Sequence, residues 1–334
     1  MSDSNLFAQQ AANRRKSVWL VCGFLAFFTW VGFAGDYAWY LATRELPSGS
    51  YHHVVPFIGL ASCLVAAGYV WSAWRNGAGR ILNASGAAEL FEAATPEQRQ
   101  LQNVVEEMAI AAGIPKPRVW IIPDPDPNAF ATGHDPATAS IAVTEGLLRI
   151  LNREELQAVV AHEMSHIRNY DVRLMTLLAA LVGAVGLMSH ILLRALRNVR
   201  IRKVGKAGAP VAIVVVVFWI ITLILAPIAS AILSMAVSRK REYLADATGA
   251  QLNRNPLALA QALEKVDAAP AATRSILRGA GHLCIVDPGE RKLAAKVGFL
   301  GGLFESHPPI RLRVARLHGM GYGVERQKSV VGEE

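Results

Sequence analysis

The sequence HEMSH at residues 162–166 places two imidazoles and one carboxylate on one side of a single helical turn. At about 100° per residue, His162 and His166 point within about 40° of each other, with Glu163 close beside them. Histidines four residues apart can take two corners of a zinc tetrahedron, and the glutamate then lies beside the water-bearing corner. The stretch therefore predicts a catalytic zinc site. The alternative is an ordinary buried helix whose histidines happen to be four residues apart.

The residues before this motif indicate where its helix begins. Asn152 and Glu155 have the spacing of an N-cap and a capping box, and Glu154 adds negative charge at the positive end of the helix dipole. Apolar residues then recur at helical spacing from Leu156 to Met164. We therefore expect a helix over residues 152–170 that buries one face.

A third metal ligand is expected far downstream, in the sequence EYLAD at residues 242–246. Glu242 and Asp246 share one helical face, and zinc hydrolases use such a pair with the first carboxylate on the metal and the second holding a ligand imidazole. The alternative is a solvated acidic face. Glu242, however, follows three basic residues at the end of a long apolar run, where helix patterning requires no acid. We therefore predict Glu242 as a ligand and Asp246 as the support of His162 or His166.

Four motifs together resemble those of a known family. They are AHEMSHIRNYD at 161–171, EYLAD at 242–246, NAFATG at 128–133 and SHPPIRLR at 306–313. The chain resembles the HtpX-type integral-membrane zinc metallopeptidases, relatives of the CAAX prenyl endopeptidases, from about residue 80 to about residue 318. The resemblance implies an α-helical membrane protein with a zincin-like α+β catalytic domain, mostly helical with a small β-sheet.

The resemblance also implies an activity and its partners. We expect a zinc-dependent endopeptidase with one Zn²⁺ per chain, acting on unfolded or membrane proteins in stress-related quality control. Self-cleavage and assembly into a homo-oligomer are also consistent with an enzyme of this type. Glu163 would assist the zinc-bound water, as general base and then as general acid.

Two further regions receive roles only through the resemblance. Asn128, Ala129 and Phe130 would lie along the active-site cleft and hold an extended substrate backbone, although the sequence alone equally allows an Asx turn there. His307 would stabilise the oxyanion with support from Arg313, although the sequence alone favours a turn histidine.

The composition independently indicates a membrane protein. Hydrophobic residues make up 52% of the chain, charged residues only 18%, and the mean hydropathy is +0.29. An α-helix needs about 20 apolar residues to cross a bilayer. Four segments approach or exceed this length: 17–35, 54–74, 174–193 and 209–237. The first lacks a clear cleavage site and is therefore expected to remain as an anchor.

Basic residues predict how these spans are oriented. Three precede the first span at 14–16, only Arg44 lies between the first two, and Arg75 and Arg80 follow the second. The positive-inside rule puts the N-terminus and the catalytic region on the cytoplasmic side. The resemblance implies a multi-pass protein of the bacterial plasma (inner) membrane. The loop at 194–206, however, carries basic residues and no acid. Either the last two segments both span despite this charge, or the third is buried beside the catalytic domain.

The expected domain organisation follows from these segments. A short helix after Thr95, strands at 119–122 and 140–143, and the metal-binding helices would form the catalytic domain. The predicted parts are an anchor at 1–79, a peptidase domain at 80–173 and 238–325, an inserted hydrophobic hairpin at 174–237, and a disordered tail at 326–334.

Several other functions are disfavoured. The net charge of +8 reflects basic residues beside hydrophobic segments, where they suit anionic lipid headgroups, so we expect no nucleic-acid partner. Cys22, Cys63 and Cys284 provide neither a disulfide framework nor a cysteine metal site. A CAAX-type processing peptidase would share every ligand but usually has more spans. A non-enzymatic zinc-stabilised scaffold would fill all four metal positions with protein, usually with cysteine.

Overall fold

The computed structural model describes residues 3–43, 55–181, 239–269, 281, 283–286 and 308–331. These residues form two compact units. The sheet unit comprises the described residues of Met1–Arg15, Asn76–Ala180 and Ser234–Glu334, and the described residues of the two-helix unit are 16–43, 55–75 and 181. Each unit is considered separately below.

A small mixed sheet organises the sheet unit. Its spatial order is β1-β2-β4-β3, with β2 parallel to β4 and the two outer strands antiparallel to their neighbours. The strands are β1 (Ala88–Glu89), β2 (Arg118–Ile122), β3 (Ala129–Thr132) and β4 (Ser140–Thr144). Because β3 is an edge strand, one of its sides faces away from the sheet.

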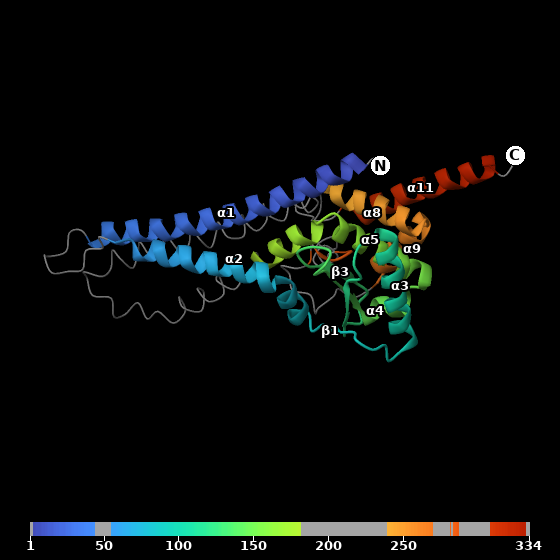
Figure 1. Ribbon diagram of the computed structural model, residues 1–334, viewed down its shortest axis with the longest axis horizontal. Coiled ribbons are helices and arrows are strands. Elements are labelled where there is room, and N and C mark those ends of the chain that lie inside the picture. Colours follow the sequence, from blue (N-terminus) through green and yellow to red (C-terminus); the bar gives the residue numbers. More distant parts are fainter. Residues whose placement is uncertain are drawn as a thin grey trace. The chain divides into compact units, whose positions relative to one another are not determined.

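Helices surround this sheet, and several begin with the caps that the sequence predicts. Thr95 caps α3, Thr144 caps α4, and Asn152 caps α5 in a capping box with Glu155. Figure 1 shows α3 and α5 near each other beside the sheet, and α5 also contacts α8 and α9. The helices are α3 (Pro96–Ala112), α4 (Glu145–Ile150), α5 (Arg153–Arg168), α8 (Arg239–Asn253), α9 (Pro256–Asp267) and α11 (Ile310–Val331).

Alternating side chains of the strands divide the core into two layers. One set, including Ile121, Ile141 and Ala131, packs with α3, α5 and α9 in the larger hydrophobic cluster. The intervening residues, including Phe130 and Ala142, pack on the other side with the end of α2 and with residues 171–181. Successive strand residues face opposite sides of the sheet. β3 and β4, whose residues are all buried, therefore contribute to both layers, and one of these layers packs against α5.

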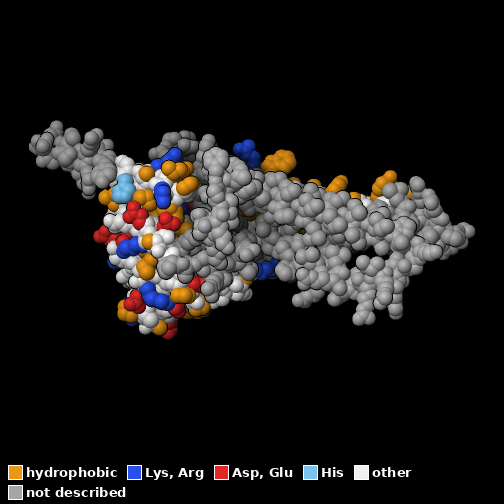
Figure 2. Space-filling model, turned by 180° about the vertical axis from the view of Figure 1, so that it is seen from behind, with side chains coloured by type: hydrophobic (Ala, Val, Ile, Leu, Met, Phe, Trp, Pro, Cys, Tyr) orange, Lys and Arg blue, Asp and Glu red, His pale blue; other side chains and the backbone are white. Residues whose placement is uncertain are grey.

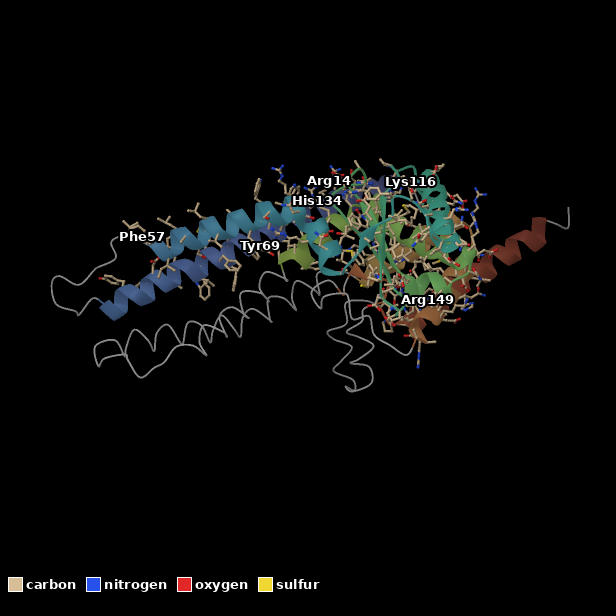
Figure 3. All side chains as sticks on the ribbon, turned by 90° about the horizontal axis from the view of Figure 1, so that it is seen from below. Arg14, Phe57, Tyr69, Lys116, His134 and Arg149 are labelled. Carbon is tan, nitrogen blue, oxygen red and sulfur yellow. The ribbon has the colours of Figure 1, made fainter. Side chains whose placement is uncertain are left out.

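The two-helix unit consists of most of α1 (Asp3–Thr43) and most of α2 (Phe57–Ala84). The carboxylate of Asp36 accepts hydrogen bonds from the backbone amides of Ile58 and Gly59, which caps the start of α2. Large apolar side chains point outward, including Trp19 and Leu64, each 75% exposed, and Phe57, labelled in Figure 3. Gln10–Tyr37 and Phe57–Ala84 are long and apolar enough to cross a membrane.

The surface of the sheet unit has a different character. Figure 2 shows acidic and basic side chains interspersed among other residues on one face of this unit. Lys116 and Arg149, both labelled in Figure 3, make exposed ion pairs with Glu106 and Glu145. A surface of mixed charge is typical of contact with water.

The observed architecture is the predicted fold class, mostly helical with a small four-stranded sheet. The helix expected at 152–170 is interrupted by a turn at 169–170 and resumes over 171–181. Most of the segment 174–193 and the whole of the segment 209–237 lie outside the described residues. α11 continues to Val331, where a disordered tail was expected from residue 326, because residues 324–331 contain neither glycine nor proline and include good helix formers.

Candidate metal centre

Two helices from distant parts of the chain bring the predicted ligands together. α5 carries His162 and His166, and α8 carries Glu242 in its first turn. The hydroxyl of Ser165 on α5 lies 3.4 Å from the backbone carbonyl of Ala245 on α8, so the two helices approach closely here. All three predicted ligands are buried.

Their ligand atoms converge on one point. Nε2 of His162 and Nε2 of His166 are 3.2 Å apart. Oε2 of Glu242 is 3.8 Å from Nε2 of His162, and Oε1 is 3.6 Å from Nε2 of His166. Within the part of the chain that the structure describes, these residues form the one group of three whose ligand atoms could hold a metal ion.

These separations fit a small tetrahedral cation. Bond lengths of about 2.0–2.1 Å place two corners of a tetrahedron about 3.4 Å apart. The two imidazole nitrogens lie at about this separation, and each carboxylate oxygen of Glu242 lies 3.6 or 3.8 Å from one of them. Two imidazoles and one carboxylate also form the donor set of catalytic zinc sites, which leave a fourth corner for water. The residues present therefore fit a divalent metal with one open position.

Asp246 supports the first histidine and is itself held by an arginine. Its Oδ1 lies 3.1 Å from Nδ1 of His162. The guanidinium of Arg313 donates to both oxygens of Asp246, from Nε at 2.9 Å and from Nη2 at 2.7 Å. Burial alone would raise the pKa of Asp246, but the charge of Arg313 and these hydrogen bonds lower it to about 2.

The second histidine has its own carboxylate. Nδ1 of His166 lies 3.1 Å from Oδ2 of the buried Asp171. Burial works against protonation of His166, but the hydrogen bond to Asp171 and the charge of Glu242 raise its pKa to about 9. Each imidazole thus has a carboxylate behind it that fixes the ring and leaves Nε2 directed toward the metal position.

Glu163 lies beside the predicted ligands, and burial is the main influence on its pKa. It is buried, and burial raises its pKa above the ordinary glutamate value, although both histidines oppose the shift. The backbone amide of Ala131 on β3 hydrogen-bonds to its carboxylate. A carboxylate with a raised pKa next to an open metal corner is suited to taking up and releasing a proton.

The predicted substrate-binding segment forms the start of β3. Asn128 is buried, and its side-chain amide donates to the backbone carbonyl of Val286. The backbone carbonyl of Ala129 accepts from the amide of Ile285, and Phe130 pairs with Cys284 in an isolated antiparallel bridge. The chain's own residues 284–286 therefore occupy this part of the outer edge of β3.

Of the two remaining predicted residues, the structure describes Arg313 and does not describe His307. Arg313 is fully buried at the centre, 3.7 Å from Glu242, whereas Arg311 two residues earlier is exposed. His307 lies outside the described residues. Sequence reasoning gave no role to Asp171, although an acid just after the helix that carries a metal ligand was a usable signal.

The chain is similar to known proteins along most of its length. The sequence profile of Peptidase family M48 matches residues 95–320. A protein named Protease HtpX homolog from Streptococcus gordonii is 38% identical over 317 residues, which cover 94% of this chain and 100% of the relative. One of the same name from Lactobacillus acidophilus is 39% identical over 319 residues, covering 94% and 100%. The predicted resemblance to the HtpX type is confirmed.

A solved structure is also similar. The crystal structure of S. mikatae Ste24p aligns with a TM-score of 0.46 and 17% identity, covering 94% of this chain and 67% of that chain. A likeness of this strength carries no argument about function. The family match and the full-length relatives are sufficient to assign the family. Together with two helices able to cross a membrane, they indicate a membrane location. The chain therefore belongs to Peptidase family M48, as a metalloprotease that acts on peptides or proteins at a membrane.

Proposed function

We propose that the metal is zinc, one ion per chain, held by His162, His166 and Glu242. The observation that carries this proposal is the convergence of three buried ligand atoms from α5 and α8 at separations of 3.2 to 3.8 Å. When bound, zinc supplies a Lewis acid that polarises the scissile carbonyl and lowers the pKa of a water molecule toward 7.

Glu163 is proposed as the proton carrier of the reaction. It takes a proton from the attacking water and later delivers that proton to the leaving amine. Its raised pKa supports this role, because a carboxyl group that binds a proton more tightly than usual can both accept and return it. The amide of Ala131 holds the carboxylate in place between transfers.

Arg313 and Asp246 are proposed to orient His162. Two hydrogen bonds join the guanidinium to Asp246, and a third runs to the backbone carbonyl of Ile285. Two of the five N–H groups of Arg313 are not used by these bonds, so its charge is also available to oppose the negative charge that develops on the carbonyl oxygen. His307 remains a predicted partner in that stabilisation.

The substrate backbone is proposed to extend along the outer edge of β3. Ala131 follows Ala129 by two residues and therefore presents its backbone carbonyl toward the same edge, while its amide is bonded to Glu163. Because residues 284–286 already pair with Ala129 and Phe130, the substrate would run past Ala131 rather than along the whole segment from Asn128. Main-chain pairing of this kind gives affinity with loose side-chain selectivity, which suits unfolded segments of membrane or misfolded proteins.

We further propose a multi-pass protein of the bacterial inner membrane whose catalytic site faces the cytoplasm. The peptidase domain would combine 80–173 and 238–325, with 174–237 as an inserted membrane hairpin and 1–79 as the anchor. The basic residues at 14–16, Arg75 and Arg80 support this orientation. The activity and the location also allow cleavage of a second copy of the chain, or self-assembly.

The decisive experiment is a cleavage assay with an unfolded reporter protein in detergent, run on the purified full chain. We expect cleavage to stop with a metal chelator and to return when zinc is added, with elemental analysis finding about one zinc per chain. Cleavage that persists in metal-free enzyme, or active protein without stoichiometric zinc, would contradict the proposal.

Orientation can be tested separately at Lys116, whose side chain is 44% exposed. A Lys116→Cys variant that lacks the three native cysteines should react with an impermeant thiol reagent in inverted vesicles and not in spheroplasts. The opposite pattern would place the catalytic unit outside the cytoplasm.

A further inference from the structure

The turn that follows α5 lies directly behind a proposed metal ligand. α5 ends at Arg168, and Tyr170 then adopts a positive φ of 59°, a conformation that non-glycine residues rarely take. This bend lets Asp171 reach back to His166, with its Oδ2 3.1 Å from Nδ1 of the ring. The position of His166 therefore depends on the orientation of Asp171.

The first helix of the chain contacts this turn. The side-chain amide of Gln10 donates to the carbonyl of Arg168 at 2.9 Å. Arg14, labelled in Figure 3, lies over the ring of Tyr170 at 4.5 Å. Between them, Asn13 comes three residues after the first and one before the second, so all three side chains share one face of α1.

Asn13 makes the contact that reaches the metal ligand. Its Nδ2 donates to the backbone carbonyl of Asn169 at 3.1 Å and to Oδ1 of Asp171 at 2.6 Å. Asn13 is 2% exposed and Asp171 is fully buried. Both partners of Nδ2 are acceptors, so the amide nitrogen must face them. One oxygen of Asp171 is thereby tied to Asn13, and the other is aimed at His166.

The energetics favour a role beyond simple packing. A buried carboxylate that loses a hydrogen-bond donor can rotate to find another, and its second oxygen then leaves the imidazole. The neighbouring cation, Arg241, lies 3.8 Å from the same Oδ1, too far to replace the amide without movement. Outer partners of metal ligands commonly change metal affinity about 10- to 100-fold when they are removed.

We propose that Asn13, in the segment that precedes the first apolar span, is a positioning residue for the metal ligand His166 and acts through Asp171. The inference rests on the proposed function, because it assumes that His166 binds the metal. It makes the N-terminal end of α1 part of the peptidase machinery rather than only a membrane anchor.

The test measures zinc affinity by chelator competition on the full chain in detergent, in a Glu163→Gln background that prevents self-cleavage. Asn13→Ala should weaken zinc binding about tenfold or more. Asn13→Asp, which keeps the size but replaces the donor with a second acceptor, should weaken it at least as much. The matched control is Gln10→Ala, which removes a hydrogen bond to the same turn without touching Asp171 and should change affinity by less than about threefold. Thermal unfolding of the metal-free variants checks that each is folded, and two Asn13 variants keep the test open if one is not.

A double-mutant cycle separates positioning from general support. In an Asp171→Asn background, Asn13→Ala should change zinc affinity little further, because the residue through which it acts is already altered. Unchanged affinity in the folded Asn13 variants, an equal loss in Gln10→Ala, or full additivity with Asp171→Asn would each overturn the inference. A parent that takes up no zinc would instead refute the proposed function.

Discussion

Gly249 lies directly against the backbone of His162. A Cβ atom at residue 249 would lie 2.9 Å from both the backbone nitrogen and the Cα of His162, closer than real Cβ contacts come. Gly249 follows Glu242 by two helical turns, on the same face of α8. The absence of a side chain here therefore allows α8 to approach α5 until Glu242 reaches the two imidazoles.

Replacing this glycine should separate the two helices. We predict that Gly249→Ala lowers stability by about 1–3 kcal/mol and weakens zinc binding, because the added methyl group meets backbone that cannot rotate away. Gly319→Ala on α11 is the matched control, since a Cβ at that position meets nothing within 4 Å. Thermal unfolding and chelator competition measure the two effects. Equal behaviour of both variants would show that the close approach is not required.

The second prediction concerns Glu163. Glu163→Gln should retain about one zinc per chain while cleavage falls by about 10²–10⁴-fold, because the amide cannot carry the proton. Glu154→Gln, at the exposed start of the same helix, serves as the control and should cleave normally. A Glu163→Gln enzyme with most of its activity would refute the assigned role.

Two arginines of α11 should behave differently. Arg313→Ala should destabilise the fold by about 3–5 kcal/mol, because it leaves the charge of Asp246 buried without its partner. Arg311→Ala removes an exposed side chain from the same turn and should change stability by less than about 0.5 kcal/mol. The comparison is made on metal-free protein by thermal unfolding. If Arg311→Ala proved the more harmful variant, the central position assigned to Arg313 would be wrong.

The fourth prediction is a dependence of stability on pH. The pKa of Asp246 is lowered from its ordinary value of 3.8 to about 2, so its ionised form stabilises the folded state. This contribution, about 2 kcal/mol, is fully present above pH ~4 and is lost as the pH falls toward 2.

A double variant isolates this effect from the other carboxyl groups. The difference in Tm between the parent and Asp246→Asn combined with Arg313→Met should stay constant from pH 7 to about pH 4. Below that it should shift in favour of the variant, in metal-free protein. A difference that already changes between pH 7 and pH 5 would mean that Asp246 titrates at a higher pH than the structure indicates.

The sequence predicts those parts of the site that depend on local spacing. The cap at Asn152 and the pair His162 and His166 lie on one helix. Each depends only on residues within two turns of itself, where the geometry is nearly fixed by the backbone. Glu242 could be predicted because an acid after three basic residues and an apolar run conflicts with simple amphipathic patterning. The structure brings its carboxylate within 3.6 Å of His166.

The remainder depends on contacts between distant segments. The tie from Asn13 to Asp171 joins residues 158 positions apart, and an asparagine before a hydrophobic span carries no local signal of such a partner. The pairing of Ile285 with Ala129 was likewise invisible, because no strand pattern marks the short segment around residue 285. Tertiary packing alone selects these partners.

The division of the ligands between α5 and α8 has a consequence for synthesis of the protein. About 75 residues separate His166 from Glu242, so at ~5–20 residues per second the ribosome delivers the last ligand about 4 to 15 s after the second. During that interval the nascent chain carries only two of the three proposed ligands, so the proposed metal centre is incomplete while residues 167–241 are being made.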